Sequence, residues 1–234
     1  MRGTAARHDA VDGSLGSLGS LGGLAADEPV PVLAYGMDEG TGTTVRDGSG
    51  KGNNGRAYDT TWADGRFGGS VRFSDDGNGW IATPSSTSLR MTEGMTVSAW
   101  VNPSKTGTEQ MLLKWANAET DFRVFASEPG SSSPSVVALG DMSPPFQLPS
   151  RRTLPVGAWS HLAVTFEKGT FALYVNGEPA EMRRGSFSPS DGAALFGIAG
   201  SNTAPFAGKV DEVRAYTAAL SPAQVRTLME TPVP

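Results

Sequence analysis

The sequence predicts an all-β fold in which two antiparallel sheets pack face to face, with one short helix near the C-terminus. Three observations predict it. From residue 30 onward, short apolar or alternating runs recur, which is the pattern of half-buried strands. Clusters of Gly, Pro, Asn, Asp and Ser separate these runs and mark turns. With 30 Gly and 16 Pro among 234 residues, the chain has the turn content and the length of a single sandwich domain.

Ten segments carry the strand pattern. Each is rich in β-branched, aromatic or aliphatic residues, which suit a pleated and partly buried surface. In chain order they are residues 32–37, 69–73, 95–102, 110–115, 122–126, 135–140, 161–167, 170–176, 194–200 and 209–216.

Two turn signals predict hairpins between consecutive strands. The tripeptide Glu-Lys-Gly joins 161–167 to 170–176, and Asn176 with Gly177 follows directly. Asn-Gly is suited to the positive φ angles of a tight hairpin turn. The chain is therefore expected to fold back on itself twice in this region.

One segment, residues 220–229, is expected to be helical. Ser221 can cap its start, and Pro222 suits the first helical turn. Val225, with Leu228 or Met229, supplies one apolar side of the helix. The sandwich should therefore end in a single short helix.

Three segments lack the strand rhythm. Residues 1–30 contain the repeat SLGSLGSLGG and are too polar for a secretion signal; we expect a flexible linker, with a degraded signal as the alternative. Residues 127–135 and 141–155 are rich in Pro and Ser and are expected to be exposed loops. The domain itself should span residues 31–230.

Composition excludes several partners. The net charge of −5, without clustered Lys and Arg, disfavours nucleic acid. The chain has no run of about 18 apolar residues, so the sequence predicts no membrane span. The chain has no cysteine, so disulfides and thiolate zinc sites are excluded. We expect a monomer.

Three stretches together resemble one family. The first is residues 34–58, which contain GTGTTVRDGSGKGNNG, with residues 66–73. The second is MTVSAWVNP at 95–103 with residues 158–180, which begin AWSHLAVTF, and the third is FAGKVDEVRAYTAALSPAQV at 206–225. In this order they resemble a laminin-G-like jelly-roll domain of the concanavalin A-like lectin/glucanase superfamily. The resemblance covers about residues 31–230. It implies a two-sheet sandwich used as a module of secreted or surface proteins, often beside carbohydrate-active enzymes, and in many members a structural calcium ion.

Asp211 and Glu212 stand side by side in the last strand. A period of two puts Asp211 on the face of Val213, and Glu212 on the opposite face with Arg214, where the two can pair. Asp211 then falls on the apolar side, where a carboxylate needs a partner because an unpaired buried charge is costly. A calcium ion with several oxygen ligands is one such partner.

The loop at residues 47–55, DGSGKGNNG, offers the other oxygen ligands and resembles the calcium loop of the family. In that family the loop and the late Asp-Glu pair approach each other. We therefore expect a structural calcium ion bound by Asp47, Asn53 and Asp211. The alternative is that Asp47 and Asn53 are turn residues and that Asp211 is a hydrogen-bonding group.

Carbohydrate rings usually stack on exposed aromatic side chains, so the tryptophans are sorted by position. Trp115, at the end of an apolar run, is the best stacking candidate, and Phe146 is the second. The other four tryptophans are expected to be structural. Trp100 and Trp159 should pack in the core, and Trp62 and Trp80 should cover the sandwich edge.

Catalysis is not expected. Hydrolases of this fold place carboxylates as Glu-x-Asp-x-Glu on one strand, and the chain has no such triplet. His161 is expected to be a hydrogen-bonded structural residue. The sequence therefore favours a non-catalytic extracellular or cell-surface module that binds a glycan, or a protein, with a structural spacer as the alternative.

Overall fold

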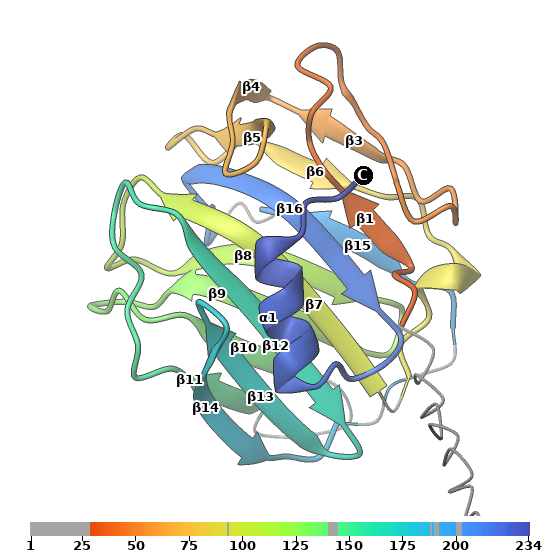
Figure 1. The fold of residues 1–234 in the computed structure, drawn as a ribbon. Helices are drawn as coiled ribbons and strands as arrows, with labels where there is room; N and C mark the ends of the chain where they lie inside the picture. The colour runs from red at the N-terminus through yellow and green to blue at the C-terminus, as the bar shows by residue number, and fades with distance from the viewer. Residues whose placement is uncertain (1–28, 93, 140–144, 188, 190–191, 200–202) are drawn as a thin grey trace, which may run out of the picture.

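Two antiparallel sheets of eight strands each form the fold, as the sequence predicts (Figure 1). The computed structural model describes residues 29–234 except 93, 140–144, 188, 190–191 and 200–202. The expected linker or signal, residues 1–28, lies outside the described residues.

Sheet A has the order β14-β13-β12-β7-β16-β5-β4, and β1 also pairs with β16. Its strands are β1 (Leu33–Tyr35), β4 (Thr60–Asp64), β5 (Gly69–Phe73), β7 (Gly94–Pro103), β12 (Ser160–Glu167), β13 (Thr170–Val175), β14 (Glu178–Arg184) and β16 (Gly208–Tyr216).

Sheet B has the order β11-β10-β9-β8-β15-β6-β3-β2. Its strands are β2 (Thr44–Val45), β3 (Gly55–Tyr58), β6 (Trp80–Ala82), β8 (Gln110–Ala116), β9 (Asp121–Ser127), β10 (Ser135–Leu139), β11 (Phe146–Pro149) and β15 (Leu195–Ile198). A 3₁₀ turn, η1 (Thr87–Leu89), precedes β7.

The strand register divides sheet B into an inner and an outer face. One row of cross-strand partners runs across the sheet and is buried in the main core: Ala57, Ile81, Ile198, Leu113, Val124, Val136 and Leu148. Because side chains alternate along a strand, the next row points outward. That row contains Arg56, Ala82, Gly197, Lys114, Arg123, Val137 and Gln147.

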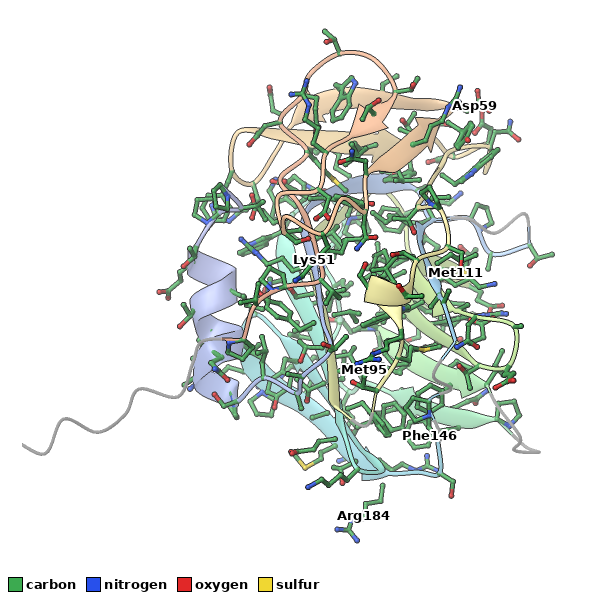
Figure 2. The ribbon with its side chains drawn as sticks, turned by 90° about the vertical axis from the view of Figure 1, so that its right-hand side faces the viewer. Lys51, Asp59, Met95, Met111, Phe146 and Arg184 are labelled. Carbon is green, nitrogen blue, oxygen red and sulfur yellow. The ribbon has the colours of Figure 1, made fainter. Side chains whose placement is uncertain are left out.

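The outer face of sheet A is covered by the predicted helix, α1 (Pro222–Glu230). Ser221 and Gln224 form a capping box at its start, and Pro222 occupies the first turn. Val225 and Leu220 pack against Tyr174 on β13 and against Tyr216 on β16. Figure 1 shows α1 lying across this sheet, and Figure 2 shows it on the opposite side of the sandwich from Met111 on β8. In the described part of the chain, no helix is long and apolar enough to cross a membrane.

Both predicted hairpin turns are confirmed. Lys168 and Gly169 have φ angles of 45° and 81° between β12 and β13, and Asn176 and Gly177 have 53° and 74° between β13 and β14. Two consecutive positive φ angles are typical of type I′ turns. Gly and Asn adopt them at little cost, which explains these residues in the sequence.

Six strands lack a strong sequence signal: β2, β3, β4, β6, β11 and β14. Most are short. The longest, β14, is a polar and largely exposed edge strand, so it has no apolar alternation. The expected loop at 141–155 contains β11, which begins at Phe146.

The last strand corrects the prediction for Asp211. A β-bulge interrupts the pairing of β16 with β7 between Asp211 and Arg214, and Glu212 has a φ of 55°. The extra residue breaks the period of two. Val213 therefore faces the main core, while Asp211 pairs with Trp100, which lies outside that core cluster. Asp211 is on the outer face of sheet A and not on its apolar inner face.

Candidate functional site

Asp47 organises the loop that precedes β3. Its Oδ1 accepts hydrogen bonds from the backbone nitrogens of Ala34 and Ser49, both at 3.0 Å. Its Oδ2 accepts from Ser49 Oγ at 2.7 Å and from the backbone nitrogen of Asn53 at 2.8 Å. A carboxylate has about four acceptor positions, so all of them are used by donors of the loop and of β1.

Asn53 ties the same loop to the rest of the sandwich. Its Nδ2 donates to the Val32 carbonyl at 2.7 Å, and its Oδ1 accepts from Ser88 Oγ at 3.1 Å. The Tyr35 hydroxyl donates to the Asn53 carbonyl at 2.7 Å, and burial raises the pKa of Tyr35 well above its usual range. Asn53 therefore works as a buried hydrogen-bonding residue.

Asp211 binds a different loop, the turn between β4 and β5. Its Oδ2 accepts from the backbone nitrogens of Arg66 and Phe67 at 2.7 and 3.0 Å. Both of these side chains pack on Trp100. Burial raises the pKa of Asp211 to about 6, and the two backbone donors limit the rise. The carboxylate that sequence reasoning assigned to a cation thus holds a turn closed over the outer face of sheet A.

The predicted calcium ligands do not fit a shared cage in this arrangement. Asp47 and Asn53 direct their oxygens to hydrogen-bond donors, and Asp211 does not line the open cleft of ≈ 400 Å³ beside Asp47. Among the residues that the structure describes, no group of three or more His, Asp or Glu side chains is placed to hold a metal ion. Calcium binding stays a prediction from the resemblance.

The two predicted stacking residues are core residues, which corrects their assignment. Trp115 is 0% exposed, and its Nε1 donates to the Leu89 carbonyl at 2.6 Å. Phe146 is 5% exposed and stacks on Phe171 with ring centroids 4.3 Å apart. Both lie in an inward row of sheet B, so neither presents a ring face to a ligand.

His161 is also buried, on the outer face of sheet A beside Trp100. Its backbone pairs with Asn176, but neither ring nitrogen has a hydrogen-bond partner among the described residues. Burial and the Arg214 guanidinium lower the pKa of His161 to about 3. A neutral, enclosed imidazole of this kind cannot reach a substrate in solution.

In the described part of the chain, no helix covers the outer face of sheet B, because α1 lies on the other sheet. Met111, Phe125 and Ala204 form a small buried cluster with Val137 on one part of this face, and we call the rest the open face. One aromatic pair stands on it. Trp80 on β6 and Tyr58 on β3 are direct cross-strand partners, and their rings stack with centroids 4.6 Å apart and planes 18° apart. Trp80 is 37% exposed, and the Arg56 guanidinium lies 5.2 Å from the Tyr58 ring centroid. This pair is stacked, and its Trp80 ring is accessible to solvent.

A charged cluster stands on the same face, with one strand, β15, between it and the strand that carries Trp80. Lys114 on β8 and Arg123 on β9 are cross-strand partners. The Oδ2 atom of Asp121 lies 3.3 Å from Lys114 Nζ and 2.6 Å from Arg123 Nη2. Between cluster and pair lie the small residues Ala82 and Gly197. We call this set of seven the platform: Arg56, Tyr58, Trp80, Ala82, Gly197, Lys114 and Arg123.

Sequence reasoning missed Trp80 as a site residue. Alternation within the run Trp80-Ile81-Ala82 supplies the missing signal, because Ile81 must face the core and so turns Trp80 outward. The run is too short to be recognised as a strand without its neighbours in the sheet.

A family model described as the concanavalin A-like lectin/glucanases superfamily matches residues 75–226, more than half of the chain. The chain belongs to the concanavalin A-like lectin/glucanase superfamily. No curated protein matches its sequence significantly.

Solved structures share the fold of this concanavalin A-like domain. Domain 4 of AbnA, an extracellular arabinanase from Geobacillus stearothermophilus solved with arabinotriose, is 24% identical with a TM-score of 0.71, covering 87% of this chain and all of that one. The botulinum neurotoxin serotype D ligand-binding domain, in complex with N-acetylneuraminic acid, is 14% identical with a TM-score of 0.69. The binding domain of Paraclostridial Mosquitocidal Protein 1 is 16% identical with a TM-score of 0.68.

This chain spans about half the length of the two toxin domains, covering 50% and 51% of them, while they cover 86% and 85% of it. At these identities the likeness extends to the fold alone.

Proposed function

We propose that this domain is a non-catalytic module that binds a glycan on the platform of sheet B. The observation that carries the proposal is the stacked pair of Trp80 and Tyr58 on the open face. Aromatic rings bury large areas at a low cost in conformational entropy, and Tyr58 holds the indole of Trp80 in one orientation. An apolar sugar face can therefore stack on Trp80 without first ordering it.

Polar groups beside the pair suit sugar hydroxyls. Lys114 and Arg123 supply N–H donors on the same face. Leu195 on β15, which is 38% exposed, adds apolar surface in the row of Ala116 and Asp121, on the side of the charged cluster away from the aromatic pair. Aromatic rings can stack on the apolar face of a sugar, and the N–H donors can bind its hydroxyl groups.

The structural neighbours support a glycan over other ligands. Two of the similar domains were solved with a saccharide bound, arabinotriose in one and N-acetylneuraminic acid in the other. One belongs to an extracellular arabinanase, which supports the proposal that this module works outside the cell. The absence of a Glu-x-Asp-x-Glu triplet from the sequence supports a binding role without catalysis.

A glycan array with the wild-type domain and the Trp80→Ala variant tests the proposal. We expect the wild type to bind at least one polysaccharide and the variant to lose most of that binding, because the stacking surface is gone. Met182→Ala is the matched control, since Met182 is an exposed apolar residue on β14 of sheet A. It should bind as the wild type does.

Two outcomes would contradict the proposal. A folded wild-type domain that binds no glycan on the array would favour the structural spacer or a protein-binding module. Equal binding by wild type and Trp80→Ala would place the glycan on another surface.

A further inference from the structure

We propose that the platform selects glycans that carry carboxylate groups, such as chains of uronic acids. The inference rests on the proposed function, because it specifies the ligand of the same site. In it, Lys114 and Arg123 bind a sugar carboxylate at one end of the platform, and Arg56 binds a second at the other end.

The charged cluster holds two cations in place with one carboxylate between them. Lys114 and Arg123 lie directly opposite each other on neighbouring strands, with side chains on the same outer face. Like charges in this position destabilise a strand pair. Asp121 Oδ2 contacts both and compensates only one of them. The remaining positive charge faces solvent, where a ligand carboxylate can compensate it through charge-assisted hydrogen bonds.

The cations are fixed before a ligand arrives. Asp121 accepts from both Nε and Nη2 of Arg123, at 3.1 and 2.6 Å, which orients the guanidinium. About one third of each side chain is exposed to solvent, 33% for Lys114 and 34% for Arg123. Both cations are therefore accessible, yet less of their rotamer freedom is lost on binding than for a fully exposed side chain.

The platform is longer than the charged cluster. Arg56 stands in the same outward row as Lys114, separated from it by Gly197 and Ala82. Three strand spacings separate β8 from β3, a distance of about 14 Å. A Cβ added to Gly197 would meet only the Ile81 carbonyl oxygen, at 3.6 Å, so the space above Gly197 is open. This low floor between two cationic ends fits an extended chain with more than one negative group.

The sign of the platform differs from that of the chain. The full chain carries a net charge of −5, which repels anionic polymers at long range. Arg56, Lys114 and Arg123 are three cations, of which Asp121 contacts two and Glu109 acts on Arg123 through space, so these five groups carry a net charge of +1. A neutral glycan needs no such arrangement, whereas a polyanionic one does.

Isothermal titration calorimetry with two probes tests the inference. The probes are oligogalacturonate, a chain of galacturonic acids, and an uncharged galactan chain of the same length. We expect the wild-type domain to bind oligogalacturonate at least about tenfold more tightly at low salt. Raising the salt to about 1 M, where the Debye length is about 3 Å, should remove most of that preference.

Three variants locate the selectivity. Lys114→Gln and Arg56→Gln should each weaken oligogalacturonate binding several-fold more than galactan binding, because each removes one charge and keeps the aromatic pair. Gly197→Leu should weaken both probes, because it fills the open floor and keeps every charge. Arg184→Gln is the matched control: Arg184 is exposed at the end of β14 on sheet A, at the edge labelled in Figure 2, and its loss should change neither affinity.

The failures of the two proposals are distinguishable. Binding of galactan as tight as that of oligogalacturonate, with loss of both in Trp80→Ala, would overturn the selectivity and leave the proposed function standing. Oligogalacturonate binding that is unchanged by Lys114→Gln and Arg56→Gln would overturn the assigned cations. A wild-type domain that binds neither these probes nor any glycan on the array would overturn both proposals.

Discussion

Asp211 shows how a single buried carboxylate can serve the fold and not a ligand. Its Oδ2 fastens the turn between β4 and β5 through two backbone nitrogens, while its Oδ1 has no partner among the described residues. Burial raises the pKa of Asp211 from 3.8 to about 6. The folded protein therefore binds a proton more tightly than the unfolded chain does, and this contribution to stability is lost as the pH rises through about 6.

Asp211→Asn isolates that pH dependence. The amide oxygen can still accept from the turn, but the side chain no longer ionises. We expect the unfolding free energy of the variant relative to the wild type to rise by on the order of 2 kcal/mol between pH 4 and pH 7.5. Denaturant melts at the two pH values measure it. A difference that stays constant, or that falls with pH, would show that the native pKa of Asp211 is not raised.

Trp115 is assigned to the core by its environment, and its substitution should act on stability alone. Trp115→Phe removes the hydrogen bond from Nε1 to the Leu89 carbonyl and leaves a space beside Phe196. We expect a loss of about 2 kcal/mol of unfolding free energy, with unchanged glycan affinity of the folded variant. Denaturant melts and titration calorimetry measure the two effects. A loss of affinity without a loss of stability would restore Trp115 as a binding residue.

At the scale of the element, the bulge in β16 positions the C-terminus. Glu212 Oε2 accepts from Arg214 Nη2 at 2.9 Å and from the backbone nitrogen of Val233 at 2.6 Å. Arg214 in turn donates to the Leu228 carbonyl and to the Thr231 carbonyl. The Glu212–Arg214 pair, which the sequence predicts correctly, thus fastens the end of α1 and the residues after it to sheet A. Burial raises the pKa of Glu212 to about 7, and Arg214 limits the rise.

Arg214→Gln tests this attachment. The substitution leaves Glu212 buried without its cation, so we expect a loss of about 3 kcal/mol of unfolding free energy and faster hydrogen exchange in residues 222–234. Arg226→Gln is the control, because Arg226 and Glu178 form an exposed pair on the surface. Its effect should stay within about 0.5 kcal/mol. Equal effects of the two substitutions would contradict the role of the buried pair.

At the scale of the whole molecule, the repeated apolar runs and turn dipeptides were enough to predict the sandwich. Long strands such as β7 and β12 have enough apolar residues to be recognised from their own sequence. The Asn176-Gly177 turn is recognised from its two residues alone, because they favour positive φ angles. The edge strand β14 was missed because its side chains are largely exposed, with only Ala180 packed partly against the core. It forms by pairing with β13 across the Asn176-Gly177 turn and has no apolar pattern of its own.

The candidate site was predicted less well than the fold, for a related reason. Asp211 was misplaced because a bulge shifts the period of two, and a bulge has no local signature in this run. Trp115 was misjudged because the polar residues that follow it in the sequence do not indicate that its side chain is buried in the folded sheet. The platform draws on β3, β6, β15, β8 and β9, so only the register of the whole sheet brings it together.

A thermal melt with and without chelator tests the calcium prediction. Because the acceptor positions of Asp47 are filled by hydrogen bonds from its loop and from β1, we expect the same melting temperature in calcium and in EDTA. An ion present at 100 times its dissociation constant would contribute about 2.7 kcal/mol to stability. A clearly higher melting temperature in calcium would therefore contradict our interpretation and support the site predicted from the sequence.

An NMR titration that follows the indole N–H signals of the five tryptophans tests the central claim most directly. A glycan found on the array is added in steps, and each signal is assigned by single substitution to Phe. We predict that the Trp80 signal moves with the same affinity as the calorimetric binding curve. The Trp115 signal should not move, because its N–H is bonded to Leu89 inside the core. Saturable shifts of Trp100 or Trp159 with none at Trp80 would contradict the claim that the open face of sheet B binds the glycan.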